Sequence, residues 1–196
     1  ISPQVWAWKE NRVKGIKENV DKMLVILPFE KNFYKKWNYE VEYVGHPLVE
    51  VVDSWLASNI NKDRLIQNTP QQTTKIIALL PGSRKQEILK KLPIMLQVSK
   101  NFPDYHFVVA KAPGLDEDFY NKLLLPYQNV SSVVNKTYEL LSQSNAALVT
   151  SGTATLETAL FGVPEVICYK GNYLSYLIAR RLIKIKYIGL VNLIMD

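Results

Sequence analysis

The strongest constraint on the fold is a regular alternation of short β-branched runs with longer amphipathic stretches, which begins at Lys75. Strands are expected at 75–80, 105–110, 130–134, 146–149 and 165–169, with helical patterns between them at 85–100, 116–125, 137–143 and 153–161. Strands joined by helices of this length pair in parallel through crossover connections. The pattern therefore predicts a Rossmann-like, doubly wound parallel sheet of the α/β class.

The residues before this pattern have an α/β character of their own. Two short strands are expected at 23–28 and 41–45, around a helix near 29–36, and they read as the end of a second Rossmann-like domain. A helix over Leu48–Leu56 then leads into a polar connection at Asn59–Thr74. We therefore expect three parts: residues 1–47 end an N-terminal α/β domain, 48–74 connect, and 75–196 form the Rossmann-like domain.

Composition narrows the class of protein without choosing a function. The 196 residues are 47% hydrophobic and 21% charged, which excludes a disordered or low-complexity chain. The net charge of +6 suits a nucleic acid, an anionic membrane surface or a phosphorylated substrate equally well. A single cysteine, Cys168, fits a reducing cytoplasm. The chain begins at Ile1 and stops after an apolar run, so we expect it to be an excerpt of a longer protein.

The loop after the first strand of the sheet has the residues of an anion site. Open α/β sheets bind ligands at the carboxyl ends of their strands. In Leu80-Pro-Gly-Ser-Arg, Gly82 permits close backbone approach, Ser83 can cap the next helix and Arg84 can clamp a phosphate. The loop lacks the Gly-Lys-Ser/Thr ending of a Walker motif. A plain turn with a solvated arginine is the alternative.

The loop after the fourth strand of the sheet has a similar character. Small and hydroxyl residues open the next helix, whose first turn can hold a diphosphate: Ser151, Gly152, Thr153, Ala154 and Thr155. One turn later, Glu157 can accept hydrogen bonds from ribose hydroxyl groups. A capped helix without a ligand is the alternative, but two such loops in one sheet favour a nucleotide site.

Four weaker signals have structural interpretations. Asp116 and Asp118 could hold a metal, but they open a helix whose dipole they complement, so we expect no metal site. His46 and His106 lack partners at zinc-ligand spacing. The aromatic residues of the N-terminal region are expected in a core: Trp6, Trp8, Tyr34, Trp37 and Tyr39. Residues 169–187 read as a basic amphipathic helix that either meets an anionic membrane surface or phosphorylated substrates, or is simply solvated.

A set of motifs, in order along the chain, carries a family resemblance. The motifs are Ser2-Pro-Gln-Val-Trp-Ala-Trp, Leu27-Pro-Phe-Glu-Lys, Val44-Gly-His-Pro-Leu, Leu80-Pro-Gly-Ser-Arg, Thr150-Ser-Gly-Thr-Ala-Thr-Leu-Glu, Ala179-Arg-Arg-Leu and Leu190-Val-Asn-Leu. Together they closely resemble the lipid A disaccharide synthases over nearly the whole chain. The resemblance implies an inverting glycosyltransferase of the GT-B fold, with no cofactor. It implies transfer of 2,3-diacylglucosamine from its UDP derivative to 2,3-diacylglucosamine 1-phosphate, which forms a β-1,6 disaccharide 1-phosphate and UDP.

The same resemblance implies roles for particular residues. Arg84 matches an essential arginine near the donor phosphates, residues 151–155 with Glu157 match the nucleotide loop, and Asn192 matches a functionally important asparagine. Leu174 departs from the aromatic residue of many members. The family's acceptor residues and general base would precede Ile1, so the chain alone is expected to be inactive. Lipid substrates imply peripheral contact with the cytoplasmic face of the inner membrane, while oligomeric state, a homodimer included, stays open.

Three alternatives remain at this point. Another GT-B enzyme, a UDP-N-acetylglucosamine epimerase or the lipid II-forming transferase, would share the glycine-rich loop and the ribose-binding glutamate. A non-catalytic basic module would bind nucleic acid with a steep dependence on salt. A purely structural excerpt would pair with a partner chain or aggregate. The resemblance favours the synthase and predicts no binding of nucleic acid.

Overall fold

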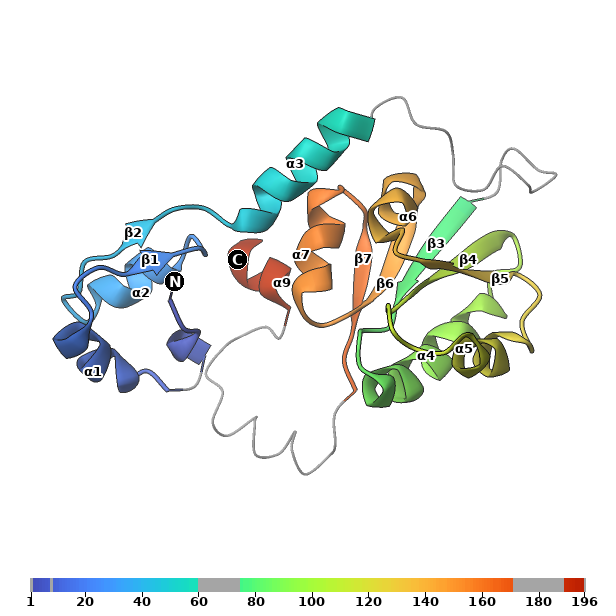
Figure 1. Ribbon diagram of the computed structural model, residues 1–196, viewed down its shortest axis with the longest axis horizontal. Coiled ribbons are helices and arrows are strands. Elements are labelled where there is room, and N and C mark those ends of the chain that lie inside the picture. The colour runs from blue at the N-terminus through green and yellow to red at the C-terminus, as the bar shows by residue number, and fades with distance from the viewer. Residues whose placement is uncertain (1, 8, 60–74, 171–188, 196) are drawn as a thin grey trace. The chain divides into compact units, whose positions relative to one another are not determined.

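The computed structural model describes residues 2–7, 9–59, 75–170 and 189–195 (Figure 1). The chain divides into two compact units. The first comprises residues up to Ser58 and the C-terminal segment that holds helix α9 (Leu190–Met195). The second runs from Asn59 to Lys170. The functional assignment of 1–47, 48–74 and 75–196 stays a prediction.

The second unit is built on a five-stranded sheet in the order β5-β4-β3-β6-β7, and all of its pairings are parallel. The strands are β3 (Lys75–Leu80), β4 (Tyr105–Lys111), β5 (Val130–Val134), β6 (Ala146–Thr150) and β7 (Glu165–Cys168). The chain adds strands to one side of β3 and then to the other, so the strand order reverses between β3 and β6. The predicted doubly wound parallel sheet is confirmed.

Helices cover both faces of this sheet (Figure 1). They are α4 (Lys85–Ser99), α5 (Glu117–Leu124), α6 (Thr137–Gln143) and α7 (Thr153–Leu160). Successive side chains of a strand point to opposite faces, so Leu79 packs with Ile88 and Leu92 of α4, whereas Leu80 packs with Leu140 of α6. Burial on both faces explains why the central parts of the inner strands β3, β4 and β6 are apolar.

The first unit has a smaller core around two short parallel strands, β1 (Leu24–Val25) and β2 (Glu42–Tyr43). The elements around them are the 3₁₀ helix η1 (Val5–Ala7), α1 (Arg12–Asn19), α2 (Glu30–Lys35) and α3 (Pro47–Asn59). Tyr34 is fully buried, Trp6 is 7% exposed, and Trp37 and Tyr39 pack against the same cluster. The aromatic residues are therefore core residues as predicted, with Trp8 outside the described residues.

Two predictions from the sequence fall wholly or largely outside the described residues. Of the polar connection predicted at Asn59–Thr74, residues 60–74 lie outside the described residues, and so do residues 171–187 of the basic helix predicted at 169–187. The first two residues of that prediction, Tyr169 and Lys170, are not helical. Among the described helices, none combines the length and the apolar character that crossing a bilayer requires.

A buried carboxylate holds the first unit together at the turn between β1 and α2. Glu30 is 1% exposed, and its Oε2 accepts hydrogen bonds from the N–H groups of Ile26 (3.1 Å) and Leu27 (2.9 Å). Buried backbone donors need partners, and a charged acceptor is a strong one. The glutamate of the Leu27-Pro-Phe-Glu motif thus satisfies the backbone of the turn that precedes its own helix.

We expect Glu30→Ala to lower the free energy of unfolding by about 2–4 kcal/mol, because two buried N–H groups lose their acceptor. Glu30→Gln keeps an acceptor oxygen and should cost less. Denaturant titration followed by circular dichroism measures both. Glu18→Ala, at an exposed position of α1, is the matched control. Equal stability of the Glu30→Ala and Glu18→Ala chains would contradict the role of Glu30.

Candidate nucleotide site

The candidate site lies at the carboxyl ends of β3 and β6, where the strand order reverses. Leu80 is opposite Val149 in the parallel register, so the loops that follow the two strands leave the sheet side by side. A Cβ atom added to Gly82 would lie 3.7 Å from Cγ2 of Thr150. The structure therefore brings together the two loops that the sequence singled out, at the position where doubly wound sheets bind ligands.

Only glycine suits position 82. Its φ of +106° lies in a region that side-chain-bearing residues rarely adopt. An added Cβ would also lie 2.9 Å from Oε2 of Glu87. Glycine thus lets the backbone turn sharply just before α4.

The predicted cap of α4 by Ser83 is wrong. The N-cap residue is Arg84, whose carbonyl accepts the first helical bonds, from Glu87 (2.9 Å) and Ile88 (3.0 Å). Ser83 lies one residue too early, and no side chain caps the helix. The N-terminal N–H groups of α4 therefore keep their capacity for an anion, which the helix dipole also favours.

The Arg84 guanidinium lies at the surface, in an ion pair with Glu87. Its side chain is 82% exposed, and its Nη1 lies 3.0 Å from Oε1 of Glu87. An exposed pair of this kind contributes at most about 1 kcal/mol, since both charges stay solvated. A phosphate can replace Glu87 at little cost, and it offers the guanidinium two acceptors at once.

The second loop has the same design. Gly152 is the N-cap of α7, with a φ of +148°, and again no side chain caps the helix. The hydroxyl of Thr155 is used inside the loop, where it donates to the carbonyl of Gly152 at 2.8 Å. Thr155 is fully buried, so it shapes the loop, whereas Gly152 and Thr153 are exposed. At the end of β6, the buried hydroxyl of Thr150 has no hydrogen-bond partner among the described residues.

One turn into α7, the half-buried Glu157 faces a tyrosine of the neighbouring helix. Oε1 of Glu157 accepts a hydrogen bond from the hydroxyl of Tyr138 at 3.1 Å. Burial, with the nearby charge of Glu157, raises the pKa of Tyr138 above its usual value of 10. The phenol therefore stays protonated and donates. This pairing was not predicted from the sequence, because the two residues are far apart along the chain.

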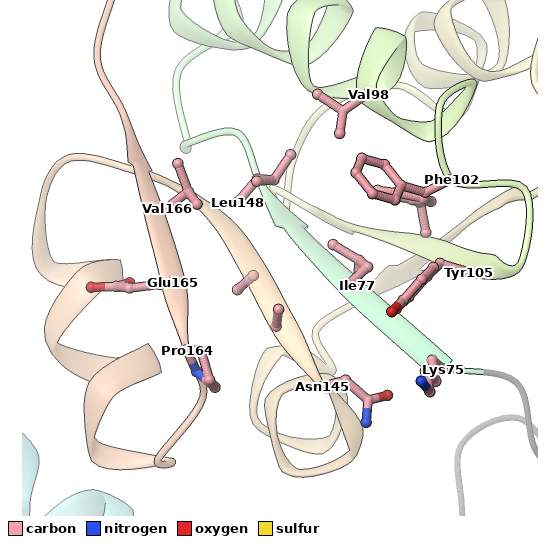
Figure 2. A pocket seen from close by; sticks show the side chains of 13 residues that line it. Lys75, Ile77, Val98, Phe102, Tyr105, Asn145, Leu148, Pro164, Glu165 and Val166 are labelled. Atoms are coloured by element: carbon pink, nitrogen blue, oxygen red, sulfur yellow. The ribbon is translucent and has the colours of Figure 1, made fainter.

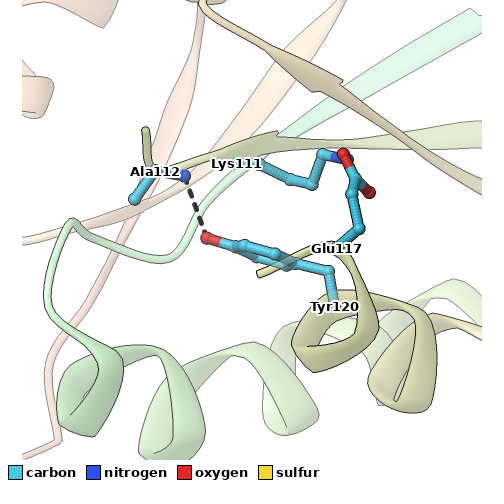
Figure 3. A network of polar contacts seen from close by, with 4 residues as sticks. All are labelled: Lys111, Ala112, Glu117 and Tyr120. Carbon is cyan, nitrogen blue, oxygen red and sulfur yellow. Dashed lines mark hydrogen bonds and ion pairs between the residues drawn. The ribbon is translucent and has the colours of Figure 1, made fainter. Parts of the chain in front are cut away.

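The loop after β4 is held by a small polar network (Figure 3). The Lys111 side chain is 9% exposed, and its Nζ lies 2.6 Å from Oε2 of the more exposed Glu117. The Tyr120 hydroxyl accepts the N–H of Ala112 at 2.9 Å, and burial raises the pKa of this phenol. Glu117, which lies between the two residues considered for a metal, Asp116 and Asp118, thus pairs with a lysine. No group of three potential metal-ligating side chains occurs among the described residues.

The chain matches a family of known proteins along its whole length. The sequence model of the lipid-A-disaccharide synthetase family matches residues 1–196. The chain belongs to this family. It is 41% identical to a lipid-A-disaccharide synthase of Syntrophus aciditrophicus over 99% of the chain and 51% of the relative. It is 40% identical to lipid-A-disaccharide synthase 1 of Legionella pneumophila over the same shares. The chain thus spans about half the length of these curated relatives.

A solved structure places this family member in a wider fold class. The UDP-GlcNAc 2-epimerase of Neisseria meningitidis, bound to UDP-GlcNAc, superposes with a TM-score of 0.55 at 20% identity. The match covers 84% of this chain and 49% of the epimerase. At this identity the likeness establishes the GT-B fold alone.

Other residues named from the sequence belong to other elements or fall outside the described residues. Asn192 is exposed on α9, which belongs to the first unit. Leu174 lies outside the described residues. His46 accepts the N–H of Leu48 on its Nδ1 at the start of α3, and His106 pairs with the hydroxyl of Ser131. Both histidines thus have structural partners.

A hollow of about 560 Å³ lies at the opposite, amino-terminal edge of the sheet (Figure 2). Its lining is mainly apolar and includes Ile77, Phe102, Leu148 and Val166. Doubly wound sheets bind their ligands at the other edge, and this hollow offers no cluster of charges for a phosphate. It is therefore not the candidate site.

Glu165 borders this hollow, and burial removes its carboxyl group from solvent. In Figure 2 its side chain points away from the labelled apolar residues, and neither carboxylate oxygen has a hydrogen-bond partner among the described residues. Burial raises the pKa of Glu165 from 4.5 to about 7. Between these two values the folded chain binds more protons at this group than the unfolded chain does. Glu165 therefore lowers stability progressively as the pH rises through this window, and fully above it.

We expect Glu165→Gln to raise the thermal midpoint at about pH 8 and to change it little at about pH 4, where the carboxyl is neutral in both states. Thermal unfolding at a series of pH values measures this difference. Asp104→Asn, at an exposed position, is the matched control. A Glu165→Gln chain that is no more stable than the native chain at the higher pH would show that the carboxylate has a partner.

Proposed function

We propose that this chain forms the donor-binding part of a lipid A disaccharide synthase. The complete enzyme would transfer 2,3-diacylglucosamine from its UDP derivative to 2,3-diacylglucosamine 1-phosphate, giving the β-1,6-linked disaccharide 1-phosphate and UDP. The family match supports this activity. The observation that carries the donor site is the meeting of two uncapped helix N-termini and Arg84 at the reversal of the strand order.

The proposed roles follow from where charge develops. Displacement at the anomeric carbon places negative charge on the departing UDP, and preorganised donors stabilise such charge most effectively. Gly82, Ser83 and Arg84 would hold one part of the diphosphate, and residues 151–155 the other. Glu157 would accept from the ribose hydroxyl groups. Because a guanidinium and two helix dipoles supply the positive charge, this route uses no metal.

The remaining parts of the proposal concern the whole enzyme. Asn192 would contribute to catalysis from the C-terminal helix, and acceptor binding would fall to the part of the relatives that this chain does not span. Acylated substrates would draw the enzyme to the cytoplasmic face of the inner membrane as a peripheral protein. A homodimer is compatible with this arrangement.

A UDP-N-acetylglucosamine epimerase is the second candidate, favoured by the structural neighbour alone. It would share the uridine nucleotide site, so its substrate distinguishes it. Epimerisation of UDP-N-acetylglucosamine by a polypeptide of the relatives' full length that contains this chain would overturn the synthase proposal. Formation of the acylated disaccharide would support it.

Calorimetric titration of the chain with UDP tests the donor site directly. ATP and a short single-stranded DNA are the controls, each at two salt concentrations. Saturable binding that prefers UDP supports the proposal. Selective binding of DNA that weakens steeply with salt would instead support the nucleic-acid alternative. A folded chain that binds no UDP would refute the donor site.

We expect Arg84→Ala to weaken UDP binding by about ten- to a hundredfold, because the guanidinium donates charge-assisted hydrogen bonds to phosphate. Its side chain is too exposed for its loss to disturb packing, so the thermal midpoint should hardly move. Arg12→Ala, at an exposed position of α1, is the matched control. Equal losses of UDP binding in the two variants would exclude Arg84 from the site.

A further inference from the structure

The contact between α6 and α7 has a consequence for nucleotide binding. Tyr138 is the second residue of α6, and Glu157 lies in the middle of α7. Both helices cover the same face of the sheet, since Leu140 of α6 and Ala154 of α7 pack against one core cluster. The sheet therefore holds the tyrosine and the glutamate at a fixed separation.

The Tyr138 ring is anchored by packing. Its centroid lies 5.2 Å from that of Phe161, which follows Glu157 by one helical turn. A tyrosine side chain has only two rotatable bonds, so this packing leaves the hydroxyl little freedom. The hydroxyl is consequently a rigid donor aimed at Oε1 of Glu157, at 3.1 Å.

Glu157 needs such a donor if it is to recognise a ribose. Fixing a glutamate side chain costs up to about 2 kcal/mol of conformational entropy. This cost weakens ligand binding unless the side chain is already fixed in the unbound protein. One bond from Tyr138 to Oε1 fixes the plane of the carboxylate and leaves Oε2 and the second lone pair of Oε1 as acceptors. Two vicinal hydroxyl groups present two donors of matching spacing.

We infer that Tyr138 is a positioning residue, whose hydroxyl holds the Glu157 carboxylate ready for the ribose diol of a uridine nucleotide. This inference rests on the proposed function. Tyr138 acts through Glu157 and makes no contact with the reacting atoms. The raised pKa of Tyr138 means that the phenol keeps its proton throughout the neutral range.

The test compares two ligands on one variant. Tyr138→Phe keeps the ring against Phe161 and removes only the hydroxyl. We expect it to weaken UDP binding by about tenfold, while binding of 2′,3′-dideoxyuridine diphosphate stays within about twofold of the native value. Tyr105→Phe, at the opposite edge of the sheet, is the control and should bind both ligands as the native chain does. Thermal midpoints of all chains confirm that they are folded.

The outcomes separate the inference from the proposed function. If Tyr138→Phe weakens both nucleotides equally, or neither, the hydroxyl does not act through the ribose and the inference fails. If the native chain binds UDP and the dideoxy analogue equally well, Glu157 does not recognise the ribose, and the inference fails while the diphosphate site stands. If the native chain binds neither nucleotide, the proposed donor site fails as well. In a Glu157→Gln background, Tyr138→Phe should have little further effect on UDP binding.

Discussion

The candidate site depends on the parallel pairing of β3 with both β4 and β6. Because β3 is central, the chain adds β4 and β5 on one side of it and then β6 and β7 on the other. Doubly wound sheets bind ligands where the strand order reverses in this way, here at the carboxyl ends of β3 and β6. The same pairing sets Gly82 against Thr150. Two helices then begin at one edge of the sheet, and their positive ends reinforce each other there. The strand order alone thus sets where the two loops lie, and the side chains then determine what the loops can bind.

The sheet and both loops could be predicted from the sequence because their signals are local. The apolar runs at 75–80 and 130–134 match β3 and β5, and the expected helix at 137–143 matches α6. The position of the helix start was harder to predict. Ser83 is a good cap by composition, but the extended backbone of Arg84 makes that residue the N-cap. A difference of one residue decides whether a side chain or a ligand takes the free N–H groups.

Contacts between distant residues had no signal in the sequence. One such contact joins Tyr138 to Glu157. In another, Oδ1 of Asn145 accepts a hydrogen bond from the N–H of Ile76 at 2.9 Å. No local sequence pattern connects the residues of either pair. Such pairs depend on the register of the strands and on which face each helix covers. The acidic start of α5 shows the same limit: a metal and a helix dipole were considered for Asp116 and Asp118, but the pairing of Glu117 with Lys111 was not predicted. That partner, at the end of β4, becomes recognisable only once the strand and helix are packed together.

The motifs that carried the resemblance divide according to what their charged side chains contact. Glu30 is buried, and its Oε2 accepts both neighbouring backbone donors, so its position suits the turn and not a ligand that arrives from solvent. Arg84 is the opposite case: its side chain is largely exposed, and it forms an ion pair with Glu87 that contributes little to stability. Glu157 lies between these extremes, because it is half-buried and one of its oxygens accepts the bond from Tyr138. A motif residue that is buried and bonded inside the protein stabilises the fold, and one that is held in place but stays at least partly exposed is where a ligand is expected.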